Sequence, residues 1–163
     1  MKQVEEFSLI KGHGIEGDIN ANPISPRQVL VVRDEDISDL GIPPGELREN
    51  ILISGIQPEN FTPGSLVSFD SGAAIRLTFH CEPCKRIAHL VDSLKILQAK
   101  RGILGVVINS GTIWRAKNFG GDEGHNTIRW LNVGFYAKSH ISIESGAVEH
   151  QPHDFAAYKS QQR

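Results

Sequence analysis

Glycine and proline interrupt the chain at short intervals, and their spacing limits the length of the elements that can form. The 163 residues include 16 glycines and 8 prolines. Between them lie short runs rich in valine, isoleucine and other apolar residues, a pattern typical of strands rather than of long helices. We expect strands at residues 28–32, 50–53, 65–69, 73–79, 103–108, 112–114, 127–133 and 140–143.

Two turn sequences join neighbouring strands in this prediction. Asp70-Ser71-Gly72 connects the strands at 65–69 and 73–79, and Asn109-Ser110-Gly111 connects those at 103–108 and 112–114. Short polar turns that contain glycine are typical of β-hairpins. We therefore expect one hairpin at each turn.

Helices are expected in two places. Residues 34–40 predict a short helix, since Asp34 can cap its start and Gly41 follows its end. A longer helix is expected after Cys84 and before Gly102, because apolar residues recur there at the spacing of one helical face: Ile87, Leu90, Val91, Leu94 and Leu97. Together these elements predict an α+β fold that is β-rich, with a strongly curved sheet or closed β-barrel and a few short helices.

Length and composition place the chain among ordinary globular proteins. A chain of 163 residues with 39% hydrophobic and 22% charged residues fits one domain spanning residues 1–163. The net charge of −2 provides no basic surface for nucleic acid. No apolar run approaches the roughly 20 residues that cross a membrane, and the first residues, Met1 to Glu6, lack the apolar segment of a signal peptide. We therefore expect a cytoplasmic protein with no nucleic-acid or membrane partner.

The two cysteines of the chain lie together in His80-Cys81-Glu82-Pro83-Cys84-Lys85-Arg86. Cys84 is expected at the start of the predicted helix, where unpaired N–H groups and the cations Lys85 and Arg86 favour the thiolate over the thiol. A thiolate attacks electrophiles or binds metals, so Cys84 is the candidate reactive residue. A buried structural cysteine is the alternative.

Cys81 and a metal site are less strongly indicated. The Cys-x-x-Cys spacing is compatible with a dithiol couple, but the βαβ pattern of thioredoxin-like motifs is absent. Cys81 is therefore interpreted as a supporting or incidental residue. A zinc site would use His80, Cys81, Cys84 and His89, but the chain has no second ligand cluster of the kind that closed zinc sites need.

Four blocks of sequence, in this order, resemble the MOSC domain, the C-terminal domain of molybdenum cofactor sulfurase. They are Gly14-Ile15-Glu16-Gly17-Asp18, Arg27-Gln28-Val29, the segment from Gly45-Glu46-Leu47-Arg48-Glu49-Asn50-Ile51 to Gly55-Ile56, and Glu82-Pro83-Cys84. The resemblance spans roughly residues 12–115 and identifies the chain as a stand-alone MOSC protein of the bacterial type. Two positions depart from the family pattern: Ile19-Asn20 stands where Arg-His is usual, and Trp114 to Lys117 where Gly-Asp is usual. Residues 118–163 have no family counterpart.

The resemblance implies a β-rich curved sheet or barrel and one of two chemistries. In the first, Cys84 ligates the molybdenum of a pterin cofactor in an oxidoreductase that reduces small N-hydroxylated compounds with the help of a redox partner. In the second, Cys84 carries a persulfide for the assembly of a metal–sulfur cluster or of the molybdenum cofactor. A partner cysteine desulfurase would then supply pyridoxal phosphate, because the chain has no convincing lysine site for it. A binding module that kept the fold without catalysis is the third hypothesis, motivated by the two departures.

The resemblance also places polar residues around the cofactor. Arg27 and Arg48 are expected to grip a phosphate, which arginine binds bidentately. Asn50 is expected to hydrogen-bond the pterin ring, and Glu49 to contact the cofactor or orient an arginine. Gly17 and Asp18 are also expected at the cofactor, although a structural role for Asp18, as a cap or brace of the loop of residues 14–17, is favoured.

Overall fold

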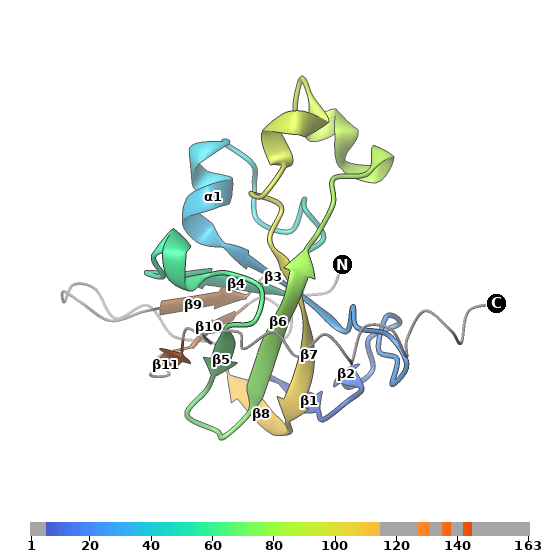
Figure 1. The fold of residues 1–163 in the computed structure, drawn as a ribbon, viewed down its shortest axis with the longest axis vertical. Helices are drawn as coiled ribbons and strands as arrows, with labels where there is room; N and C mark the ends of the chain where they lie inside the picture. Colours follow the sequence, from blue (N-terminus) through green and yellow to red (C-terminus); the bar gives the residue numbers. More distant parts are fainter. Residues whose placement is uncertain (1–5, 115–126, 131–134, 138–141, 145–163) are drawn as a thin grey trace.

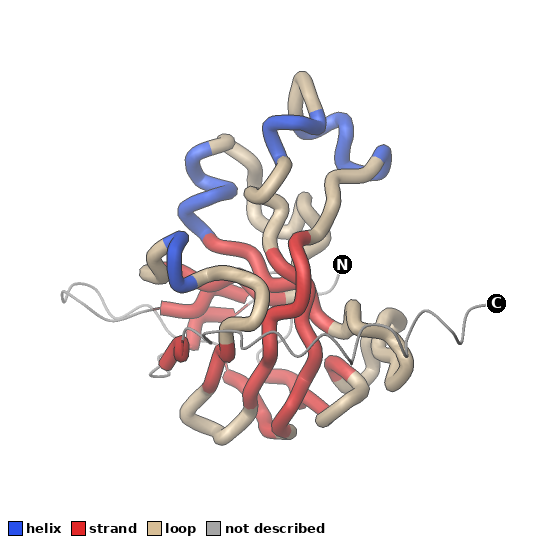
Figure 2. The backbone as a smooth tube through the Cα atoms, viewed as in Figure 1, coloured by secondary structure: helices blue, strands red, loops and turns tan. Residues whose placement is uncertain are grey.

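The computed structural model describes residues 6–114, 127–130, 135–137 and 142–144, and the side chains of residues 6–114. A strongly curved eight-stranded sheet in the order β10-β9-β4-β3-β7-β6-β5-β11 carries most of the chain, and a three-stranded sheet in the order β2-β1-β8 lies beside it (Figure 1). The helical turns gather at one end of the molecule (Figure 2). The predicted β-rich fold with few short helices is confirmed.

The strands are β1 (Glu6–Ile10), β2 (Gly14–Ile15), β3 (Val29–Arg33), β4 (Ile51–Ser54), β5 (Leu66–Ser68), β6 (Ala74–His80), β7 (Ile103–Asn109), β8 (Gly111–Trp114), β9 (Thr127–Trp130), β10 (Phe135–Ala137) and β11 (Ser142–Glu144). The helical elements are α1 (Asp34–Asp39) and three short 3₁₀ turns, η1 (Pro58–Asn60), η2 (Lys85–Leu90) and η3 (Leu94–Leu97). None of the helices in the described residues is long and apolar enough to cross a membrane.

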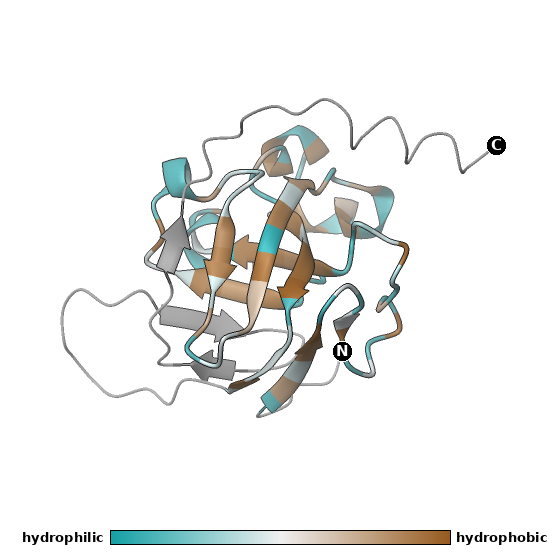
Figure 3. Ribbon diagram, turned by 60° about the horizontal axis from the view of Figure 1, so that its bottom comes forward, coloured by the Kyte–Doolittle hydropathy of each residue, from teal (hydrophilic) through white to brown (hydrophobic). Residues whose placement is uncertain are grey.

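Strand β3 is the central strand of the larger sheet. It runs parallel to β4, with Val31 opposite Ile51, and antiparallel to β7, with Val29 opposite Gly105. All five of its residues are buried, as expected for a strand that is covered on both faces. Hydrophobic residues are concentrated on the strands of this sheet in Figure 3.

The alternation of side chains along β3 separates two hydrophobic cores. Val29 and Val31 point into the inner core, which fills the space between the two sheets. Leu30 and Val32 point to the outer core, which also contains one buried residue each from α1, η2 and η3: Ile37, Ile87 and Leu97. The outer core therefore holds the helical turns, and the cysteine segment before them, against the sheet.

The predicted helix after Cys84 is wrong in type. The chain instead forms two 3₁₀ turns that are separated by an extended residue, Val91, with φ −146° and ψ 153°. The hydroxyl of Ser93 then accepts a hydrogen bond from the N–H of Lys95 and starts the second turn. This break changes the direction of the chain between the two turns. As a result, Ile87 from the first turn and Leu97 from the second both pack in the outer core.

The predicted hairpin at Asn109-Ser110-Gly111 is also wrong. Both edges of β7 are already paired, with β3 on one side and β6 on the other, so β8 has no free edge of β7 to join. The chain crosses at Ser110 into the smaller sheet, where β8 pairs with β1 and Phe7 lies opposite Ile113. The other predicted hairpin, β5–β6, is confirmed.

Gly102 precedes β7 at a point of close backbone contact. Its φ is +93°, and a Cβ atom there would lie 2.3 Å from the carbonyl oxygen of Val31. We predict that Gly102→Ala lowers the free energy of unfolding by on the order of 3 kcal/mol, since both the backbone strain and the clash act on a buried strand. Urea denaturation checks this. Gly12→Ala is the matched control, because Gly12 also has positive φ but no atom within 4 Å of its Cβ position, and a loss as large as that of Gly102→Ala would contradict the role of the clash.

Candidate functional site

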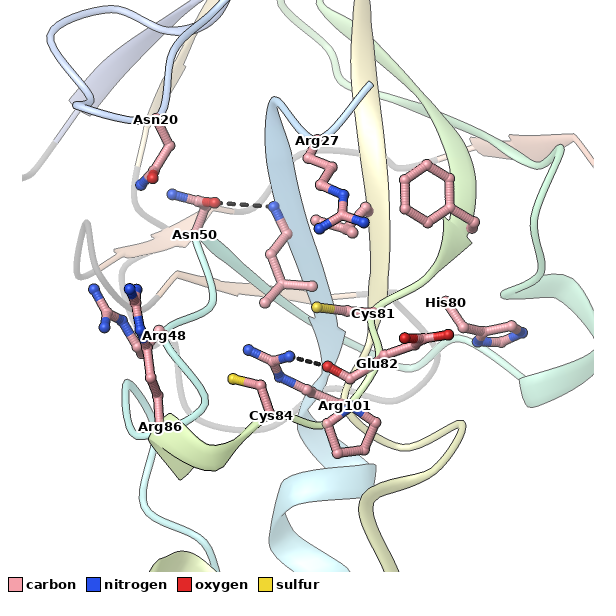
Figure 4. Close-up of a pocket in the computed structure, with 14 residues that line it drawn as sticks. Asn20, Arg27, Arg48, Asn50, His80, Cys81, Glu82, Cys84, Arg86 and Arg101 are labelled. Atoms are coloured by element: carbon pink, nitrogen blue, oxygen red, sulfur yellow. Dashed lines mark hydrogen bonds between the residues drawn. The ribbon is translucent and has the colours of Figure 1, made fainter. Parts of the chain in front are cut away.

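One cavity of about 730 Å³ opens where the loops before β3 and β4 meet the segment that joins β6 to β7 (Figure 4). Its walls combine cationic, sulfur-containing and apolar side chains from five separate parts of the chain. They are Asn20, Arg27, Leu30, Arg48, Asn50, Phe79, His80, Cys81, Glu82, Pro83, Cys84, Arg86, Arg101 and Leu104. The structure thus brings four of the expected site residues together: Arg27, Arg48, Asn50 and Cys84.

Backbone pairing explains why these distant segments meet. The N–H of Asn50 donates to the carbonyl of Leu30 (3.0 Å), which continues the β3–β4 pairing to the cavity edge. The N–H of Cys81 donates to the carbonyl of Gly102 (2.9 Å), which continues the β6–β7 pairing on the other side. The cavity therefore lies where the β3–β4 and β6–β7 pairings end, on either side of the β3–β7 pair.

Cys84 lies in the cavity between Arg86 and Arg101 (Figure 4). It is half-exposed, has an extended backbone and immediately precedes η2, so the N–H groups of that turn face its sulfur. The N–H of Arg86 lowers the pKa of Cys84 most strongly; slight burial opposes this, and the charges of Arg101 and Arg86 lower the pKa further. The expected thiolate-favouring environment is present, although a 3₁₀ turn supplies it.

Cys81 has the opposite environment. It is half-buried against the outer core, and burial raises its pKa despite the nearby charges of Arg101 and Arg27. Both cysteines are free thiols. Of the two sulfurs, Cys84 is therefore the one whose surroundings favour the thiolate, which is the form that attacks electrophiles or binds metals. Among the described residues no three His, Cys, Asp or Glu side chains converge as metal ligands, so the zinc interpretation has no such site there.

Four arginines give the cavity its electrostatic character. Arg27 lies over the ring of Phe79, with 5.5 Å from its guanidinium carbon to the ring centroid, and Arg101 donates to the carbonyl of Glu82. None of the four, Arg27, Arg48, Arg86 and Arg101, forms an ion pair with a carboxylate of the described residues. Four arginines against one lining carboxylate, that of Glu82, leave the cavity with an excess of positive charge that suits an anion, and the guanidinium group matches phosphate in geometry.

The side chain of Asn50 is used mainly for hydrogen bonds within the protein. Its Oδ1 accepts from the N–H of Leu30 (2.9 Å), and its Nδ2 donates to Oδ2 of Asp18 (2.8 Å). Asp18 Oδ1 in turn accepts from the N–H and Nδ2 of Asn20, at 2.8 and 3.0 Å. Since a carboxylate only accepts, the amide nitrogen of Asn20 must face Asp18, and its oxygen remains available as an acceptor at the cavity.

The remaining expected residues, Gly17, Asp18 and Glu49, do not line the cavity. Asp18 orients Asn20 and Asn50 without lining the cavity itself. Gly17 forms the turn before Asp18, with φ +77°. Glu49 is fully buried, and its Oε1 accepts from the N–H of Gly45 at 2.5 Å. Burial raises the pKa of Glu49 to about 7, while the backbone N–H groups of Gly45, Glu49 and Leu47 counteract it.

Sequence reasoning did not assign Asn20 or Arg101 to the site. Arg101 lies 17 positions after Cys84 in the sequence, so no local signal connected the two. Asn20 did carry a signal, since it stands at a departure from the family pattern. Parts of two expected strands, residues 131–133 and 140–141, lie outside the described residues.

We predict that Arg101→Gln raises the pKa of Cys84 and slows its alkylation near neutral pH by about two- to fivefold, because one stabilising cation is lost at a partly solvated sulfur. Rates of iodoacetamide alkylation against pH, measured in a Cys81→Ser background, check this. Lys100→Gln is the matched control: Lys100 pairs with Asp39 at 3.4 Å and does not line the cavity. An unchanged pH profile in Arg101→Gln would contradict the prediction.

The buried carboxyl of Glu49 makes stability depend on pH. Its pKa is raised from an ordinary 4.5 to about 7, so the folded state holds a proton that the unfolded state has released. This contribution is fully present below about pH 4.5 and is lost as the pH rises through 7, by up to about 3 kcal/mol. In Glu49→Gln we expect this part of the pH dependence to be absent in urea denaturation between about pH 4.5 and about pH 8. An equal decline in wild type and variant would disprove the assignment.

Comparison with known proteins provides an independent view of the chain. Residues 24–115 match the MOSC domain. Three similar solved structures are the YUAD protein from Bacillus subtilis (23% identity, TM-score 0.59, covering 69% of this chain and 82% of that one), a hypothetical protein (22%, 0.54, 70% and 59%) and YiiM from Geobacillus stearothermophilus (16%, 0.52, 98% and 89%). At these identities the likeness concerns the fold. No curated protein matches the chain. The match extends over more than half of the sequence and includes both the cysteine and the arginines of the cavity, and the chain accordingly belongs to the MOSC domain family.

Proposed function

We propose that the cavity binds a molybdenum pterin cofactor, with Cys84 as the protein ligand to the metal, and that the protein is an oxidoreductase for small N-hydroxylated compounds. One observation carries the proposal: a cysteine whose pKa is lowered shares a cavity with four arginines that no described carboxylate neutralises. Family membership supports the same cofactor. A redox partner would deliver the electrons.

The cavity suits such a group in size and chemistry. Its volume of about 730 Å³ lies within the roughly 300–1,000 Å³ typical of cofactor and small-molecule sites. The arginines match a terminal phosphate, and a thiolate is a suitable ligand for a soft metal centre. Leu30, Phe79 and Leu104 provide an apolar wall for a planar ring. When bound, the cofactor would supply two-electron chemistry at molybdenum.

The side chains of this chain bind and orient in this scheme. Arg27, held over Phe79, and Arg48 bind the phosphate from the strand side. Arg101 holds the Cys81–Cys84 segment through the carbonyl of Glu82 and favours the thiolate at Cys84. Asn20 Oδ1 accepts a hydrogen bond from a ring N–H or from the substrate, with its orientation set by Asp18. Glu49 acts through the backbone and does not contact the cofactor.

A sulfur carrier is the second candidate, and the paired cysteines favour it. Cys84 has the lowered pKa that a nucleophile toward a sulfur donor needs: its thiolate would take the outer sulfur of the donor's persulfide, and the donor cysteine would leave as a thiolate. Cys81 lines the same cavity, and once deprotonated it would attack the inner sulfur of the Cys84 persulfide, which forms a Cys81–Cys84 disulfide and releases the outer sulfur as hydrosulfide. The donor would be a pyridoxal-phosphate-dependent cysteine desulfurase. A reducing cytoplasmic setting, expected from the composition, would keep both thiols available.

Metal content tests the first candidate. Protein purified from cells grown with ample molybdate should contain molybdenum, and Cys84→Ala should lose it, because the ligating sulfur is gone. Cys81→Ala is the matched control and should retain the metal. Equal molybdenum in wild type and Cys84→Ala would overturn the proposal.

The same protein preparations also test the second candidate, the sulfur carrier. After incubation with a cysteine desulfurase and cysteine, intact mass analysis should reveal the added mass of one sulfur atom on wild type and none on Cys84→Ala. Molybdenum without such an adduct supports the oxidoreductase, whereas the adduct on metal-free protein supports the carrier.

A further inference from the structure

Arg48 has a backbone conformation that its residue type disfavours. Its φ is +62°, and among the described non-glycine residues only Arg48 and Ala99 have φ in the left-handed region. Such a conformation costs on the order of 1 kcal/mol and persists where the surroundings hold it in place. Arg48 is exposed and lines the cavity, so its own packing does not account for the conformation.

The turn that contains Arg48 is held from inside the protein. The N–H of Arg48 donates to the carbonyl of Gly45 (3.0 Å), and the N–H of Gly45 donates to Glu49 Oε1 at 2.5 Å. The N–H groups of Leu47 and of Glu49 itself also act on this carboxylate. Leu47 is fully buried in the outer core. The Glu49 carboxylate therefore closes the turn of residues 45–49 around Arg48.

We propose that Glu49 is a positioning residue for the anion site: its buried carboxylate keeps the turn of residues 45–49 closed and so holds the Arg48 guanidinium in the cavity. Only an acceptor-only group suits this place, since several N–H donors point at it. Glutamine has the same shape but would turn an NH₂ group toward N–H donors. The inference rests on the anion-binding part of the proposed function and is independent of the metal.

A purely electrostatic role for Glu49 predicts the reverse effect. A negative charge near a cationic cavity repels an anionic ligand, so its removal would tighten binding. Positioning requires instead that removal weakens binding, because Arg48 is no longer held. The sign of the change therefore distinguishes the two roles.

Acidification should act in the same direction as substitution. Below about pH 7 Glu49 gains a proton and loses part of its accepting capacity. Glu46 of the same turn also acts on this carboxyl and raises its pKa, and Oε2 of Glu46 lies 4.0 Å from Nε2 of His89 in η2. Glu46, His89 and Cys84 are common to wild type and Glu49 variants, so the comparison between these proteins removes their contributions.

Sulfate is the probe, because it stays a dianion throughout the pH range, and isothermal titration calorimetry on the full chain is the measurement. We expect Glu49→Gln to weaken sulfate binding about three- to tenfold at about pH 8 and to have a smaller effect at about pH 6, where wild-type Glu49 is mostly protonated. Glu49→Asp, which keeps the charge but is one methylene too short to reach Gly45, should weaken binding too. The Asp variant also provides the test if the Gln variant does not fold. Unchanged or tighter binding in either folded variant overturns the inference.

Two further variants show whether Glu49 acts through Arg48. Glu46→Gln removes a negative charge from the same turn without touching the contact between Glu49 and Gly45, so its sulfate affinity should be unchanged or slightly higher. In an Arg48→Gln background, Glu49→Gln should have little further effect, because the residue it positions is gone. The full loss from Glu49→Gln in that background would overturn the inference.

Different results would refute the cofactor proposal and the positioning role of Glu49. Sulfate binding by wild type together with no effect at Glu49 refutes the positioning role and leaves the cofactor proposal standing. Sulfate binding that depends on Glu49, in a protein that never acquires molybdenum, refutes the cofactor assignment and leaves the positioning role standing. No sulfate binding by wild type refutes the anion site on which both depend.

Discussion

The burial of β3 on both faces is the constraint on which the rest of the structure depends. One side of this strand closes the inner core between the sheets, and the other side carries the outer core beneath α1, η2 and η3. Leu30 belongs to the outer core and also lines the cavity. The backbone of Leu30 exchanges hydrogen bonds with both the main chain and the side chain of Asn50. The site is thus attached to a strand that is buried along its whole length, and precise binding requires such a framework.

The cavity concentrates features that a stable core would avoid. Four arginines face one space without ion-pair partners among the described carboxylates, Arg48 has a left-handed backbone, and Glu49 is a buried carboxyl whose pKa is raised to about 7. Each feature opposes folding, and an anionic ligand would relieve the repulsion among the cations. Unfavourable energies of this kind are typical of sites that bind a charged group.

The polar residues of the family motifs have two roles: some line the cavity and others hold the lining residues in place. Their sequence does not show which residue has which role. Arg48, Glu49 and Asn50 are consecutive, yet the first points into the cavity, the second is buried under the turn and the third ties the turn to β3. The left-handed conformation of Arg48 changes the direction of successive side chains at this point. Asp18 likewise does not line the cavity but hydrogen-bonds Asn20 and Asn50, which do.

The sequence by itself determined most strands, the short helix at residues 34–40, the family resemblance and the cysteine whose surroundings favour the thiolate, Cys84. Strand periodicity, turn residues and the local charges beside a cysteine are all encoded within a few positions. It did not determine the partner of β8, the break at Val91, or the places of Arg101 and Asn20 at the cavity. Those depend on which strand edges are already occupied, on how the apolar residues share the outer core, and on hydrogen bonds between segments far apart in the chain. Whether a motif residue meets the ligand or supports one that does was decided by the tertiary structure, since burial and hydrogen-bond partners set that role and neither is a local property.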